Sequence, residues 1–268
     1  MLTELFHLLL CAVICIVGAI SGIGGGVMMK PVMDGIGQFP LASIGFLTSC
    51  AVLCMAGASL CIAAVSKSEK LKLRRGAGVP LSLGAAVGGV AGKWLFEILC
   101  RSYVDETVSI VQAVMLIAIN IAVLVCVMKK SKPYSEGVQR LPVCVIIGLA
   151  LGVTASFLGI GGGPLNVAVL AIFFGMEAKE RAMHSLFIIF CAQSAGVLST
   201  VVTGTVPSFD AGVMAAMCIG AVMGAAIGAR LSRRMSNKAT DLLVVVVMVV
   251  LVGINVFNIV GFMGFIAY

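Results

Sequence analysis

The chain has 268 residues, of which 61% are hydrophobic and only 11% are charged, whereas soluble domains carry about 25% charged residues. This composition excludes a water-soluble enzyme, because too few charges are present to cover a surface that faces water. The net charge of +7 does not indicate a nucleic-acid partner either, since the basic residues form short clusters between long apolar runs. Such clusters are typical of the cytoplasmic loops of a protein that crosses the bilayer several times.

The ten cysteines predict no disulfide framework, metal site or cofactor site. Nearly all of them lie inside apolar runs, and no pair has the CxxC spacing. Small apolar thiols that pack between helices are the simplest interpretation. The first ten residues also lack the basic segment of a cleavable signal peptide, so the first apolar region is expected to belong to the fold.

Six apolar stretches are long enough to cross a bilayer as single helices, since a spanning helix needs about 20 residues. They cover residues 41–65, 77–100, 107–128, 182–202, 211–231 and 240–265. Two further apolar regions, 5–37 and 141–176, are too long for one span, and a Gly-Ile-Gly-Gly-Gly segment interrupts each of them. Because a run of glycines holds a helix poorly, each region is predicted to be two helical pieces that meet at an unwound turn.

The repeated Gly-Ile-Gly-Gly-Gly segment indicates an internal duplication. Its two copies begin 137 positions apart, at Gly22 and Gly159. A second pair of matching stretches carries glycines at every fourth position, a spacing that lets membrane helices approach closely. These glycines are Gly84, Gly88 and Gly92 in the first half, and Gly220, Gly224 and Gly228 in the second. The sequence therefore predicts two repeats, 1–130 and 140–268, joined by a cytoplasmic linker at 131–139.

Loop charges predict that the two repeats are inverted. Loops 66–76, 129–140 and 230–241 are basic and should face the cytoplasm, whereas 101–106 and 203–210 are not basic and should face outward. The charge bias thus flips between equivalent loops of the two halves, as in transporters with inverted repeats. Each half must then cross the membrane an odd number of times, so each broken region should be a re-entrant hairpin. The predicted fold is an all-α polytopic membrane protein with two inverted repeats, each a re-entrant helical hairpin plus three transmembrane helices. Kinked full crossings are the alternative.

The two interrupted segments are predicted to form a small-anion site near the membrane midplane. Irregular backbone at this depth is tolerated where it is buried or lines a wet cavity. A short helix is expected after each segment, at 26–37 and 164–176, and its first N–H groups carry the positive end of the helix dipole. Close helix packing alone is the alternative role for these glycines. The predicted substrate-binding glycines are Gly22, Gly24, Gly25, Gly26, Gly159, Gly161, Gly162 and Gly163.

Polar side chains near these segments and within the spans complete the predicted site. Lys30 either adds positive charge near the anion or forms a surface ion pair with Asp34. His184 is either an anion ligand or proton carrier, or an interfacial histidine. Asn120 and Asn255 occupy matching positions and either line the path or hydrogen-bond between helices. The predicted polar set is Ser21, Lys30, Thr48, Ser49, Asn120, Ser156, Asn166, His184, Ser185, Gln193 and Asn255.

The stretches 18–26 and 154–164 resemble the signature of the sulfite exporter TauE/SafE family. The resemblance covers nearly the whole chain and includes the glycine-rich helices. It implies a multi-pass transporter of a bacterial or archaeal inner membrane, with sulfite or sulfonates as family substrates. Val27 departs from the family pattern, because it stands where the second half carries Pro164.

The resulting functional hypothesis is a secondary transporter of a small anion, sulfite or an organosulfonate. A passive anion channel and an intramembrane enzyme are the alternatives, although no catalytic residues are predicted. The expected partners are the anionic substrate and the lipid bilayer, and a homodimer is left open. No nucleotide-binding motif is present, so any coupling should come from ion gradients or the membrane potential.

Overall fold

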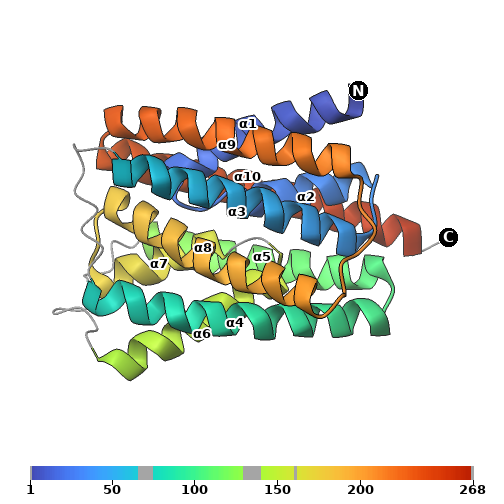
Figure 1. Cartoon of the computed structure of the whole chain (residues 1–268), viewed down its shortest axis with the longest axis horizontal. Helices are drawn as coiled ribbons and strands as arrows, with labels where there is room; N and C mark the ends of the chain where they lie inside the picture. The colour runs from blue at the N-terminus through green and yellow to red at the C-terminus, as the bar shows by residue number, and fades with distance from the viewer. Residues whose placement is uncertain (1, 66–74, 129–139, 160–161, 267–268) are drawn as a thin grey trace.

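The computed structural model describes residues 2–65, 75–128, 140–159 and 162–266, and in this part of the chain it contains ten helices and no strand (Figure 1). The described helices are α1 (Leu2–Ser21), α2 (Gly26–Ile36), α3 (Leu41–Val65), α4 (Arg75–Ser102), α5 (Asp105–Met128), α6 (Leu141–Phe157), α7 (Gly163–Phe174), α8 (Ala178–Val202), α9 (Ala211–Arg234) and α10 (Asn237–Ile266).

Seven of the described helices are long and apolar enough to cross a membrane: α1, α3, α4, α5, α8, α9 and α10. Six of them coincide with the six predicted spans, and α1, the first piece of the first broken region, is the seventh. The prediction of an all-helical, multi-pass membrane protein is therefore confirmed.

Both glycine-rich segments break their helices where the sequence predicts. Four glycines at the breaks, Gly22, Gly24, Gly159 and Gly162, have φ between 65° and 82°, a backbone conformation that residues with a Cβ rarely adopt. The helices that follow are short, with 11 residues in α2 and 12 in α7. At about 1.5 Å per residue, neither is long enough to cross a bilayer.

The first broken region enters and leaves the bundle at the same end. The first turn of α1 lies beside the start of α9, where a Cβ built on Gly212 would be 2.5 Å from Glu4 Oε1. The start of α3 lies there too, because Ser43 Oγ donates a hydrogen bond of 2.7 Å to the carbonyl of Ser208 in the loop before α9. We call this the first end of the bundle; α1 and α2 form a hairpin that opens there (Figure 1).

The second broken region opens at the opposite end, which we call the second end. The start of α8 lies beside the start of α10, where Asn237 Oδ1 accepts a hydrogen bond of 3.4 Å from the backbone N–H of Lys179. Helix α6 runs parallel to α4, since Gly84 faces the carbonyl of Val145 and Gly92 faces that of Val153. Thus α6 and α8 both begin at the second end (Figure 1). The orientation of the two ends in the bilayer stays a prediction.

The glycine-rich helices join the two halves of the chain. On α4, Gly84, Gly88 and Gly92 leave no room for a Cβ against the α6 backbone. On α9, Gly220, Gly224 and Gly228 pack in the same way on the backbone of α1. Each half therefore places its glycine face on the first helix of the other half, and both broken helices are held inside the bundle.

Candidate functional site

The turns of the two hairpins touch each other inside the bundle. A Cβ on Gly163, the first residue of α7, would collide with the backbone carbonyl of Ile23 in the first turn. Both residues are buried. The predicted convergence of the two glycine segments is therefore found in the fold.

Each turn also rests against the next span of the opposite half. In the first turn, Gly22 lies against the backbone of Ala182 in α8. In the second, a Cβ on Gly159 would lie 3.9 Å from the Cα of Gly45 in α3. The hydroxyl of Thr48, one turn further along α3, donates a weak hydrogen bond of 3.4 Å to the carbonyl of Gly159. Since Gly22 and Gly159 occupy equivalent positions, the two turns make equivalent contacts.

The glycines of the turns contact protein atoms at close range. A Cβ on Gly25 would be 2.8 Å from Cys15 Sγ, and one on Gly162 would be 2.8 Å from the Ala155 Cβ. No side chain in the described part caps α2 or α7. The packing role of these glycines is thus visible in the structure, whereas their role as direct anion ligands stays a prediction. Gly26 is buried at the start of α2, and Gly161 lies outside the described residues.

Lys30 is deeply buried rather than at a surface. Its side chain is 1% exposed, and Nζ donates hydrogen bonds of 3.0 Å to Asp34 Oδ2 and 2.6 Å to Gln112 Oε1. The Gln112 amide in turn donates a 2.6 Å bond to the carbonyl of Phe157, the last residue of α6. The expected ion pair with Asp34 is present, but it lies inside the bundle and connects to the second hairpin.

Three predicted residues, Ser49, Ser156 and Gln193, line one internal cavity between α3, α4, α6 and α8. Lys93 and Thr200 also line this cavity. Its volume is about 10 Å³, which is room for about one water molecule. A small oxyanion therefore fits only after the surrounding helices move apart.

Two hydrogen-bond donors of this cavity have no partner in the described structure. Ser156 Oγ and Gln193 Nε2 are buried and have no hydrogen-bond partner in the described structure. Lys93 Nζ lies 5.1 Å from the centre of the Phe96 ring. Glu97, one turn away, interacts electrostatically with Lys93 and accepts a hydrogen bond from Thr205. One ammonium group and two neutral donors thus converge on the cavity.

Sequence reasoning missed Lys93 and Thr200 as members of this cavity. Lys93 is four positions before Glu97 on the same predicted span, which is also the spacing of an ordinary ion pair along one helix. The available signal was a lysine inside an otherwise apolar span, because ionisable residues at that depth are functional candidates. Gln112 was missed as well, since a single glutamine in an apolar span carries no positional information.

The remaining predicted residues lie elsewhere. Ser21 Oγ donates to the carbonyl of Val17 and accepts from the Ile23 N–H, so it closes the end of α1. Asn166 is fully buried in the first turn of α7, with both amide atoms unpaired in the described structure. His184 and Ser185 are buried on α8, two and three residues after Ala182, which contacts the first hairpin.

The matching asparagines of α5 and α10 lie outside the cavity. Asn255 Nδ2 donates a hydrogen bond of 2.7 Å to the carbonyl of Leu251 in its own helix. Asn120 is fully buried, and neither of its amide atoms has a partner in the described structure. Within the described residues, neither side chain therefore forms the hydrogen bond between helices that was one of the two alternatives.

Comparisons with known proteins agree with this architecture. The family model for the sulfite exporter TauE/SafE matches residues 7–256. The chain belongs to the sulfite exporter TauE/SafE family. It is also 24% identical over 216 residues to the "Probable membrane transporter protein YunE" of Bacillus subtilis (strain 168), an alignment that covers 71% of this chain and 75% of that protein. No solved structure matches the chain. The family match and the seven candidate membrane spans together identify the chain as a multi-pass membrane transporter.

Proposed function

We propose that this TauE/SafE member is a secondary transporter that carries sulfite or an organosulfonate and binds it in the cavity between α3, α4, α6 and α8. The observation that carries the proposal is the convergence of Lys93 with the unpaired Ser156 hydroxyl and Gln193 amide. An unpaired buried donor is costly, and a ligand that accepts these hydrogen bonds would remove that cost.

The charge of the site favours a monovalent anion. Lys93 is the one charged residue among the described residues that line the cavity, and one ammonium group offsets one negative charge. Hydrogen sulfite and sulfonates carry that charge, together with several oxygens to accept from Ser156 and Gln193.

The two hairpins supply a route for alternating access. We propose that 1–130 and 140–268 act as inverted repeats in the cytoplasmic (inner) membrane, with the second end of the bundle and its linker 131–139 in the cytoplasm. Hairpins that open to opposite ends and touch at their turns support this mechanism. Helix α6 of the second hairpin lines the cavity, and the first hairpin contacts the second at Gly163. A homodimer stays a prediction, which the mass of the detergent-purified protein would test.

The proposal is tested by flux into liposomes that contain the purified protein. Radiolabelled sulfite, methanesulfonate, taurine, sulfoacetate and sulfate should be compared at one pH. We expect saturable flux of a monovalent sulfur oxyanion and weak competition by sulfate. Flux that rises linearly with concentration would support the alternative of a passive channel, and absence of flux for every anion would refute the transporter. Chemical change of the recovered anion would favour the intramembrane enzyme.

A further inference from the structure

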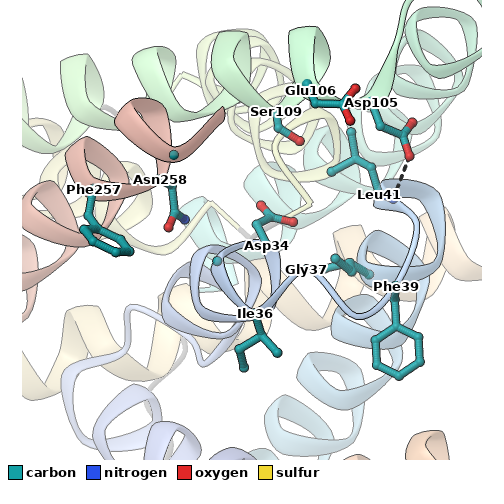
Figure 2. Close-up of a pocket in the computed structure, with 13 residues that line it drawn as sticks. Asp34, Ile36, Gly37, Phe39, Leu41, Asp105, Glu106, Ser109, Phe257 and Asn258 are labelled. Atoms are coloured by element: carbon teal, nitrogen blue, oxygen red, sulfur yellow. Dashed lines mark hydrogen bonds between the residues drawn. The ribbon is translucent and has the colours of Figure 1, made fainter. Parts of the chain in front are cut away.

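An acidic pocket opens at the first end of the bundle, away from the proposed anion site. Its volume is about 450 Å³, and α2, α3, α5 and α10 line it. Figure 2 shows Asp34 pointing into this pocket, with Asp105, Glu106 and Ser109 of α5 and Asn258 of α10 around it. No described residue contributes a basic side chain to its lining.

Asp34 connects this pocket to the interior. Its side chain is 10% exposed, Oδ2 accepts the hydrogen bond from Lys30, and Oδ1 is buried without a partner in the described structure. The aliphatic part of Lys30 extends to the second hairpin, where a Cβ on Gly159 would be 3.3 Å from both Lys30 Cδ and Cε. A single side chain thus reaches from the acidic pocket to the hairpin that carries Ser156.

The polar network is present in only one half of the chain. The positions equivalent to Lys30 and Asp34 in α7 hold Val167 and Ala171, given the 137-position offset between the glycine segments. Gln112 corresponds to Val247 in α10, given the 135-position offset between Asn120 and Asn255. The second hairpin therefore folds with apolar residues in place of this ion pair. A protein with a buried ion pair is seldom more stable than one with apolar residues of similar size at the same positions. This asymmetry points to a function.

We propose that Asp34 is the proton carrier that couples transport to a proton gradient, with the acidic pocket as the proton's entrance. This inference rests on the proposed function. When a hydronium ion in the pocket gives its proton to Asp34, the carboxylate becomes neutral and the Lys30 ammonium loses its charge partner. An anion bound in the cavity between α3, α4, α6 and α8 then returns the net charge of the bundle interior to its resting value. Proton and anion bind with positive cooperativity, and linkage makes the effect reciprocal.

A proton fits the pocket better than a metal cation. No group of three or more histidine, cysteine, aspartate or glutamate side chains in the described structure is placed to hold a metal ion. The helices α3 and α10 present no charged residue to the pocket. Among the described residues, the other charged groups at Asp34 or in the pocket lining are Lys30 on α2 and Asp105 and Glu106 on α5. Cys100, near the end of α4, interacts electrostatically with Asp105 and Lys30, and His7 of α1 contacts the ring of Phe39.

Accumulation of an anion against its gradient tests the coupling. Liposomes containing the full chain should receive a pH gradient of one unit at zero membrane potential, with methanesulfonate as a non-titrating anion and sulfite beside it. One proton per monovalent anion predicts about tenfold accumulation on the alkaline side. Asp34→Asn should still equilibrate the anion but not accumulate it. Asp210→Asn, the same change at the exposed N-cap of α9, should accumulate it like the wild type, because asparagine also caps helices.

The possible outcomes separate the two proposals. If no anion moves in the wild type, the proposed transport function falls, and the coupling falls with it. If anions move but do not accumulate, or if a sodium gradient at equal pH drives accumulation, only the proton coupling is refuted. Accumulation by Asp34→Asn would refute it as well. If Asp34→Asn does not fold, the variant Lys30→Met/Asp34→Asn removes both charges together and should show flux without accumulation.

Discussion

The contact between the two hairpin turns can be tested with the single substitution Gly163→Ala. The added Cβ would collide with the Ile23 carbonyl and lie 2.5 Å from the Ile23 Cα, whereas ordinary contacts begin at 3.4 Å. The carbonyl oxygen is closer still, so the two backbones must separate by about 2 Å at that atom, and overpacking of this kind typically costs about 1–3 kcal/mol. We expect a value near the upper limit, because both partners are backbone and neither can change rotamer.

A matched control is available in Gly253→Ala. Gly253 also lies in a helix, but a Cβ there would have no described neighbour within 4 Å. Alanine at this position should leave stability unchanged or slightly increased, since it favours helix over glycine. The assay is thermal unfolding in detergent, followed by anion flux in liposomes. Gly163→Ala should unfold at lower temperature and lose at least tenfold in flux. Equal behaviour of the two variants would refute the contact between the turns.

Three further predictions follow from the site and the fold. Ser156→Ala should leave thermal stability unchanged or increased but weaken sulfite affinity about tenfold, because the hydroxyl has no partner without a ligand; an unchanged affinity would remove Ser156 from the site. Lys30→Met should cost about 3–5 kcal/mol of stability by leaving Asp34 unpaired, and Lys30→Met/Asp34→Asn should recover most of it; no recovery in the unfolding transition would contradict a buried pair. In a cysteine-free background, Tyr103→Cys and Val206→Cys should react with an impermeant reagent from outside and Ser236→Cys from the cytoplasm; labelling of 103 and 236 from one side would refute the proposed orientation.

The helices could be predicted from the sequence because membrane spans have a simple signature. The stretch 41–65 coincides with α3, and the glycine segments at 22–26 and 159–163 mark both helix breaks. Length, hydropathy and a repeated five-residue segment were sufficient for this. Lipid excludes irregular backbone unless protein buries it, so few alternatives remained.

The binding cavity was harder to predict because it depends on contacts between distant helices. Ser156 was chosen as a polar residue near a break, and Ser49 and Gln193 as polar residues within the spans, but nothing in the sequence placed the three together. Lys93 joins them because α4 packs on α6 through glycines, which brings its charged side chain beside Ser156. The glycines of the turns were expected to face a ligand, yet Gly25 and Gly162 contact Cys15 and Ala155. Spacing along a chain reports which residues share a helix face, but not which helix covers that face.

The central claim is that Lys93 binds the transported anion, and equilibrium binding of radiolabelled sulfite to the purified protein tests it most directly. The wild type should bind one anion per chain. Lys93→Met should lower the affinity by between about tenfold and a hundredfold, since a hydrogen bond from a charged donor is worth about 1.5–3 kcal/mol. Lys238→Met, which removes the same charge from an exposed position on α10, should bind like the wild type. Equal sulfite binding by Lys93→Met and the wild type would contradict the account.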